Sequence, residues 1–359
     1  MSTSSDTTGR TNYVKLYLMA KMMRGFSLFG IALGRAMGRV ERVEPPQEIV
    51  TISSTKGKRT IRIHIYRNKA ALGLTNGTSA VHINWHGSGW MLPLHGQNGG
   101  LIRTILSSDL LTTNAYPVTI FDCSYALSPE HPAPAPYEDA RDVYDYLMKN
   151  ATKFNVDMDR VTLSGTSAGA TLALGLAVKL ASEQVHREGG SAETRVHPIK
   201  GISAFYPPVN WLGERATVPE PPQPKTWPGT LMPPFVSDVI TIAHFFSPSS
   251  SPLSPEEETK RIEELKRRVE ISPALAPTRD FPPILLLWTT EYDHLSVKAE
   301  ALRERLQKDG GKVEGKYIKG VGHGWDLEVQ KDQFGYQDRI DAYDDTVKMI
   351  ARVDSRKDR

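Results

Sequence analysis

Short apolar runs alternate with longer amphipathic stretches along most of this chain. Ile61, Ile63 and Ile65 alternate with polar residues, a period of two that is typical of a strand with one buried face. The preceding run, 49–53, would pair with it as a hairpin. Further strands are expected at 81–85, 118–122, 161–164, 199–205, 284–288 and 313–318, and helices at 136–149, 168–181, 295–308 and 337–353. This order predicts an α/β fold with a mostly parallel eight-stranded sheet and helices on both of its faces.

One region, residues 207–281, interrupts this alternation. It is rich in proline, then apolar, then heavily charged from Glu256 to Glu270. Ser254 and Pro255, followed by two glutamates, predict the start of a helix, because a serine cap, a proline in the first turn and acidic residues all favour a helix N-terminus. We interpret 207–281 as a lid inserted between two parts of one core, 46–206 and 282–359.

The N-terminal 45 residues have a pattern of their own. Between Asn12 and Val40 there are no acidic residues, while lysines and arginines interrupt the apolar positions. The uninterrupted apolar stretch, 25–34, is much shorter than the roughly 20 residues that span a bilayer, and no secretory cleavage site follows it. Three interpretations stay open. We favour a pair of amphipathic helices that cap an active site, over a basic helix lying on a membrane surface and over a mitochondrial presequence.

Composition narrows the class of protein. The chain has 359 residues, of which 39% are hydrophobic and 24% charged, as in ordinary soluble globular proteins. A net charge of +3, with no basic stripe, gives no reason to expect nucleic acid as a partner. Cys123 is the single cysteine, so no intramolecular disulfide can form, which fits a reducing compartment such as the cytoplasm. Cys123 itself is expected to be buried at a strand end.

The most informative motif is the pentapeptide at 165–169, Gly-Thr-Ser-Ala-Gly. It joins the apolar run 161–163 to a predicted helix. A sharp strand-to-helix turn exposes its corner residue, here Ser167, and places its hydroxyl at a helix N-terminus, where developing negative charge is favoured. The small residues at 165 and 169 allow strand and helix to pack closely. Ser167 is therefore the predicted nucleophile.

A nucleophilic serine needs a base and an acid that orients the base. His323 lies in a glycine-rich loop after the last predicted strand, and Asp293 follows the strand at 284–288. The chain order serine, aspartate, histidine is that of α/β-hydrolases. Glu291 is the main rival of Asp293, and Asp326 a weaker one. His82 and His86 lack acidic or cysteine neighbours in sequence, so we expect neither a metal nor a cofactor.

The turn at 86–90, His-Gly-Ser-Gly-Trp, is the expected oxyanion hole. Small residues let backbone amides approach a carbonyl oxygen, and the predicted donors are the amides of Ser88, Gly89 and Ala168. Aromatic residues are candidates for the substrate pocket or the lid, although each could equally be ordinary packing. They are Trp90, Trp211, Trp227, Phe235 and, beside the base, Trp325.

Together these motifs resemble the hormone-sensitive-lipase-like carboxylesterases of the α/β-hydrolase superfamily. The resemblance is carried by 86–90, 165–169, 293–295 and 323–325, and by 125–132 and 272–276, which are similar to the family's Tyr-Arg-Leu-Ala-Pro-Glu-His-Pro and Ser-Pro-x-x-Ala signatures. It covers about residues 47–350. It implies an α/β-hydrolase fold whose helical cap is built from the N-terminus and the 207–281 insertion.

The chain departs from the family pattern at several positions. Ser88 replaces a glycine of His-Gly-Gly-Gly, which could narrow the pocket or bind a polar substrate, although we expect it to act through its amide. Ala126 stands in place of an arginine, and 297–298, Val-Lys, in place of a frequent Asp-Glu; we expect these changes to alter supporting salt bridges rather than chemistry. Trp325 replaces a phenylalanine.

The resemblance implies hydrolysis of a small carboxylic ester, of short to medium acyl length, through an acyl-enzyme. An amidase or arylformamidase on the same scaffold is an alternative. A non-catalytic small-molecule receptor is another, which the presence of all three triad residues disfavours. Peripheral membrane contact through the basic N-terminal segment stays open.

Overall fold

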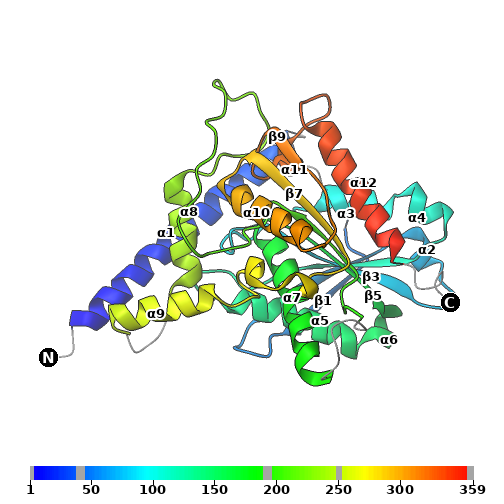
Figure 1. The fold of residues 1–359 in the computed structure, drawn as a ribbon, viewed down its shortest axis with the longest axis horizontal. Coiled ribbons are helices and arrows are strands. Elements are labelled where there is room, and N and C mark those ends of the chain that lie inside the picture. Colours follow the sequence, from blue (N-terminus) through cyan, green and yellow to red (C-terminus); the bar gives the residue numbers. More distant parts are fainter. Residues whose placement is uncertain (1–3, 38–44, 189–195, 248–252, 354–359) are drawn as a thin grey trace.

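A computed structural model describes residues 4–37, 45–188, 196–247 and 253–353 (Figure 1). One nine-stranded sheet runs in the order β1-β2-β4-β3-β5-β6-β7-β8, with β9 also paired to β7. The strands are β1 (Glu48–Ser53), β2 (Thr60–Arg67), β3 (Ser79–Trp85), β4 (Val118–Cys123), β5 (Val156–Thr166), β6 (Gly201–Phe205), β7 (Ile284–Tyr292), β8 (Val313–Glu314) and β9 (Tyr317–Gly322).

The sheet has the predicted character, with one more strand than predicted. The pairs β1–β2 and β2–β4 are antiparallel, and the pairs from β4 through β3, β5, β6 and β7 to β8 and β9 are parallel. The single strand expected at 313–318 is divided into β8 and β9. The cause is Gly315, whose φ of +91° turns the chain beside β7; a side chain there would meet the Leu287 carbonyl oxygen at 2.3 Å.

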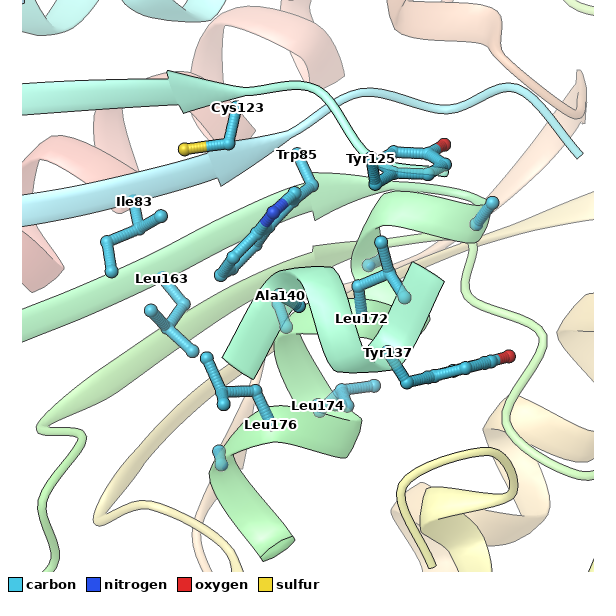
Figure 2. Packing of buried hydrophobic residues seen from close by; sticks show 14 of the residues in the cluster. Ile83, Trp85, Cys123, Tyr125, Tyr137, Ala140, Leu163, Leu172, Leu174 and Leu176 are labelled. Carbon is cyan, nitrogen blue, oxygen red and sulfur yellow. The ribbon is translucent and has the colours of Figure 1, made fainter. Parts of the chain in front are cut away.

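Helices cover both faces of the sheet, as predicted. On one face lie α5 (Ala135–Lys149), α6 (Ala151–Phe154), α7 (Ala168–Glu188) and α10 (His294–Lys308). On the other face lie α3 (Gly99–Leu106), α4 (Asp109–Thr113) and α12 (Tyr336–Arg352). The short α2 (Lys69–Leu72) lies beside β2 and α4. Figure 2 shows the hydrophobic core between the sheet and the face that carries α7, where Trp85 and Leu163 of the sheet lie against Leu172 and Leu176 of α7. Every residue of β3 is buried, because a central parallel strand is covered on both faces. Cys123 is fully buried at the end of β4, as predicted.

The N-terminal segment forms one helix, α1 (Ser4–Ala36), rather than the expected pair. Nothing interrupts it, because the segment contains no proline and its two central glycines lie in open space. Leu16 and Ala20 are buried against the body, and Arg24 is hydrogen-bonded to it. By length and composition alone, the part Tyr13–Gly34 is long and apolar enough to cross a membrane. Residues 1–3 and 38–44 of the predicted N-terminal cap lie outside the described part.

The 207–281 segment carries the helices α8 (Pro234–Phe245) and α9 (Pro255–Lys266), followed by the short 3₁₀ helices η2 (Pro273–Leu275) and η3 (Thr278–Asp280). The predicted start of α9 is confirmed. The Ser254 hydroxyl accepts from the Glu257 amide at 3.2 Å, and the Glu257 carboxylate accepts from the Ser254 amide at 2.8 Å.

Candidate active site

Ser167 lies at the sharp turn between β5 and α7. Its φ is +51°, a strained value for a residue with a side chain, and its amide donates to the Phe205 carbonyl oxygen at 2.8 Å. A side chain at Gly169 would meet the Trp85 carbonyl oxygen at 2.2 Å, and one at Gly165 would meet the backbone of Gly169 at 2.4 Å. The two glycines therefore allow the close approach that places Ser167, which is largely buried, at the corner of the turn and on the wall of a pocket.

The structure brings the three predicted residues into one hydrogen-bonded chain. His323 Nε2 lies 2.9 Å from Ser167 Oγ, and His323 Nδ1 lies 2.7 Å from Asp293 Oδ2. Asp293 is buried and caps α10, where its other oxygen accepts from the Leu295 amide at 3.0 Å. With Nδ1 donating to the aspartate, Nε2 is left to accept the serine proton.

The rival acids are engaged elsewhere. Glu291 accepts a hydrogen bond from the Gly320 amide at 2.8 Å and so supports the strand before the histidine loop. Asp326 accepts from the hydroxyl groups of Tyr206 and Tyr343, and burial raises its pKa. Neither carboxylate hydrogen-bonds to His323, which leaves Asp293 as its acidic partner among the described residues.

A segment of the 207–281 insertion holds the histidine loop in place. Thr230 and His323 exchange two backbone hydrogen bonds, of 2.8 and 3.0 Å. The Gly322 amide donates to the Pro228 carbonyl oxygen at 2.9 Å, and a side chain at Gly322 would meet Trp227 Cζ3 at 2.6 Å. The position of the imidazole thus depends on a segment almost a hundred residues earlier in the chain.

The turn after β3 presents backbone amides beside Ser167. No hydrogen bond to another described residue occupies the amides of Ser88, Gly89 or Ala168. The Ser88 side chain does not point a free hydroxyl at a substrate. Tyr125 Oη donates its only proton to the His86 carbonyl oxygen at 2.7 Å, so the Ser88 hydroxyl donates to Tyr125 Oη at 2.6 Å.

The pKa values of the histidines around this turn are shifted by burial and by Asp122. Burial lowers the pKa of His86 and of His82 to about 3, so both are neutral. Burial also opposes the charge on His95, but the carboxylate of Asp122 outweighs it through its charge and its hydrogen bonds, and the pKa of His95 is raised.

Among the described residues, His64, His95 and Asp122 form the one group that could hold a metal ion, with candidate ligand atoms within 4.8 Å of one another. His95 Nε2 already contacts Asp122 Oδ2 at 3.3 Å, and we assign the group no ion.

A pocket of about 220 Å³ opens beside Ser167, lined by residues of α8 and α10 and of the loop that follows β6. Ser167, Trp90 and Trp211 line it. Three of the aromatic residues predicted for it lie elsewhere. Trp227 packs on Tyr292 under the histidine loop, Phe235 is 69% exposed on the outside of α8, and Trp325 is fully buried against Phe205 and Tyr206. These side chains support the loops or face solvent instead of forming the pocket wall.

Sequence patterns did not identify most of the pocket wall. The residues that were missed come from the 207–281 segment and from α10, and they include Asn210, Arg215, Ile240, Lys266, His294 and Lys298. The unusual lysine at 298 was the only available signal, but it was expected to alter a supporting salt bridge. Lys298 lies on the wall of this pocket, and its role there stays a prediction.

Comparisons with known proteins agree with this fold. A family model described as the alpha/beta hydrolase fold matches residues 82–327, more than half of the chain. Among curated relatives, the versiconal hemiacetal acetate esterase of Dothistroma septosporum is 29% identical over 41% of this chain and 39% of its own length. A carboxylic ester hydrolase of Mycobacterium tuberculosis, LipN, is 31% identical over 32% of this chain and 28% of its own length. The matched segments thus span well under half of these two relatives.

Solved structures share the fold over nearly the whole chain. A Pyrobaculum calidifontis esterase superposes with a TM-score of 0.63 at 22% identity, covering 92% of both chains. Vibralactone cyclase superposes with a TM-score of 0.63 at 17% identity, covering 93% of this chain and 90% of its own. Strand order, the serine turn and the family match lead to one conclusion: this chain belongs to the α/β-hydrolase fold family, in its hormone-sensitive-lipase-like carboxylesterase branch.

Proposed function

We propose that this protein hydrolyses small carboxylic esters, with Ser167 as nucleophile, His323 as general base and Asp293 as the acid that orients it. The observation that carries the proposal is the pair of hydrogen bonds, of 2.9 and 2.7 Å, that joins the three side chains beside a pocket. The names of the curated relatives, which include esterases and carboxylic ester hydrolases, support the same reaction.

The acylation step follows from these positions. His323 Nε2 takes the proton of Ser167 as Oγ forms a bond to the ester carbonyl carbon. The negative charge on the carbonyl oxygen is held by the amides of Ser88, Gly89 and Ala168, which are preorganised and free. His323 then gives its proton to the alcohol oxygen as the carbon–oxygen bond breaks. The alcohol leaves and the acyl group stays on the serine.

Deacylation repeats these events with water. His323 takes a proton from the water as it attacks the acyl carbon, and the same amides hold the second oxyanion. The bond to Ser167 breaks, the serine recovers its proton and the carboxylic acid leaves. Asp293 stays ionised throughout and stabilises the imidazolium that forms twice in each cycle.

Covalent labelling and ester hydrolysis test this proposal together. We expect a fluorophosphonate probe to label the wild type at Ser167, and p-nitrophenyl acetate to be hydrolysed. Ser167→Ala should abolish both while the circular dichroism spectrum stays unchanged. Ser182→Ala, on a later turn of the same helix, is the control and should keep both. Labelling that persists in Ser167→Ala would refute the assignment, and preference for N-formylkynurenine over the ester would favour an arylformamidase.

We also propose that residues 1–45 and 207–281 form the cap over this site, between core parts 46–206 and 282–359. The pocket supports the second cap segment, since α8 and the loop before it supply much of its wall. For the first segment, the support is Arg24 of α1. Its guanidinium donates to the Met91 carbonyl oxygen at 2.9 Å and pairs with Glu130, so α1 lies against the chain that follows the oxyanion turn.

The outer face of α1 supports a peripheral membrane contact, which we propose as well. From Val14 to just beyond the end of the helix, an apolar stripe faces solvent, formed by Val14, Leu18, Met22, Phe26, Phe29, Leu33 and Met37. Lys15 and Lys21 are exposed on or beside it, and no acid lies between residues 12 and 40. This charge favours an anionic lipid surface as the occupant. Because Arg24, on another face, is paired with Glu130, α1 would lie along the surface rather than cross it.

Vesicle sedimentation tests this contact. The full chain should sediment with vesicles containing anionic phosphatidylglycerol more than with phosphatidylcholine alone. Phe26→Ser combined with Phe29→Ser should abolish sedimentation, whereas Leu72→Ser, which changes an exposed apolar residue on α2, should not. Absence of sedimentation, or a dimer in solution that the double variant dissociates, would overturn the proposal. The cytoplasmic location stays a prediction.

A further inference from the structure

The wall of the pocket next to Ser167 carries an excess of positive charge. Arg215, Lys266 and Lys298 line it, against one carboxylate, that of Asp238. Arg215 and Asp238 pair with each other, and Lys266 pairs with Glu263 outside the pocket, which leaves Lys298 as the lining cation without a carboxylate partner among the described residues. Burial lowers the pKa of His294, which favours its neutral form.

Lys298 lies on α10, which begins directly after the triad aspartate. Its ammonium group donates to the Leu212 carbonyl oxygen at 2.8 Å, and no carboxylate of the described residues pairs with it. An ammonium has three donors, so this bond leaves capacity for a ligand. The side chain is partly buried, where an unpaired charge is costly.

Lys266 lies at the end of α9 and lines the same pocket. Its partner is Glu263, at 3.0 Å, an exposed carboxylate one turn earlier on the helix. Lys266 and Lys298 line the same pocket, and burial together with the positive charge of Lys266 lowers the pKa of Lys298. An anion between them would offset this effect and replace part of the lost hydration of Lys298.

We propose that the pocket receives an ester that carries a carboxylate at the end remote from the scissile carbonyl, and that Lys298 and Lys266 bind this carboxylate. The inference rests on the proposed esterase activity and names its substrate class. Trp90 and Trp211 would contact the apolar chain between the two ends. The pocket admits a carboxylate on either the acyl part or the alcohol part of the ester, because both would extend from Ser167 into it.

Two pairs of esters of matched length separate these cases. Monoethyl adipate and ethyl hexanoate differ only by a carboxylate in place of a methyl group on the acyl chain. The compounds 4-acetoxybutanoate and butyl acetate differ in the same way on the alcohol chain. Hydrolysis is followed by proton release at constant pH. We expect the anionic ester of one pair to have a kcat/KM about ten-fold or more above its neutral partner, since bonds to charged groups contribute strongly. Added salt should reduce this ratio.

Variants at the lysine test its role. The quantity to follow is the kcat/KM for the anionic ester divided by that for its neutral partner. Lys298→Met should lower this ratio about ten-fold, because the KM for the anionic ester rises. Lys298→Glu should lower it further. If Lys298→Met lowers the melting temperature of the protein, Lys298→Gln replaces it as the test variant. Lys200→Met is the matched control. Like Lys298, Lys200 is partly buried, has a pKa lowered by burial and donates to a backbone carbonyl oxygen, that of His197 at 2.8 Å. It lies just before β6, at the end of the parallel strands opposite to Ser167.

The outcomes distinguish this inference from the proposed function. If the wild type hydrolyses the neutral esters as well as the anionic ones in both pairs, the anionic substrate class is overturned and the esterase stands. If the preference exists but survives in Lys298→Met, the assignment of the lysine is overturned. If no ester is hydrolysed and a fluorophosphonate does not label Ser167, both proposals fail.

Discussion

The hydroxyl of Tyr125 offers the sharpest test of how the oxyanion turn is held. It donates to the His86 carbonyl oxygen at 2.7 Å and accepts from the Ser88 hydroxyl at 2.6 Å, and all three residues are buried. Tyr125→Phe removes the oxygen atom but keeps the ring, which stacks on the His86 imidazole with centroids 4.5 Å apart. The substitution therefore leaves one buried donor and one buried acceptor without a partner.

The magnitude follows from these two groups. A buried polar group that loses its partner costs about 1–3 kcal/mol, so with two such groups we expect Tyr125→Phe to lower the free energy of unfolding by about 2–6 kcal/mol. Complete loss of an oxyanion donor costs roughly 100-fold or more in kcat, and a loosened turn should cost less, about ten-fold. Urea denaturation and steady-state hydrolysis of a neutral ester measure the two effects.

A double-mutant cycle with Ser88→Gly isolates the contact. Without the serine hydroxyl, Tyr125→Phe leaves only the His86 carbonyl oxygen unpaired, so its cost should fall by about 1 kcal/mol or more. Tyr144→Phe, a change to a buried tyrosine of α5, is the control and should cost little. If Tyr125→Phe costs the same free energy with serine or with glycine at position 88, the proposed linkage between the two hydroxyl groups is wrong.

Three further predictions concern the loops and the charges around the site. Gly322→Ala would place a carbon 2.6 Å from Trp227 Cζ3 and displace the histidine loop, so kcat should fall about ten-fold; an unchanged kcat would contradict the bracing. Arg24→Met removes an ion pair and two backbone contacts of a side chain that is 12% exposed, and should lower the free energy of unfolding by about 1–3 kcal/mol in urea. Burial disfavours the proton on His95, but Asp122 outweighs it and raises the pKa. The protonated His95 stabilises the fold fully below about pH 6.5, and this stabilisation is lost as the pH rises through the folded-state pKa. Between about pH 6 and pH 9 the free energy of unfolding should therefore fall more for the wild type than for His95→Gln. Parallel curves of free energy against pH for the two proteins would contradict this.

Features that depend on a few neighbouring residues could be predicted from the sequence. The alternation of apolar runs predicted the parallel sheet with its antiparallel hairpin, because strand and helix periods act over about ten residues. The start of α9 was predicted from Ser254 and its glutamates. The predicted nucleophile, base and acid lie at strand ends, where the carboxyl ends of parallel strands meet, and the structure joins them by hydrogen bonds.

Only the tertiary structure decided what surrounds Ser167. Trp325 is adjacent to the base in sequence yet packs in the core, whereas Lys298 reaches the pocket because α10 lies along its wall. Thr230 holds the histidine loop through backbone bonds that no side-chain pattern encodes. The sequence by itself determined the chemistry at the strand ends, since that depends on residue type and local turns. The fold decided the shape and charge of the pocket, because long-range packing of the cap on the sheet selects which side chains face it.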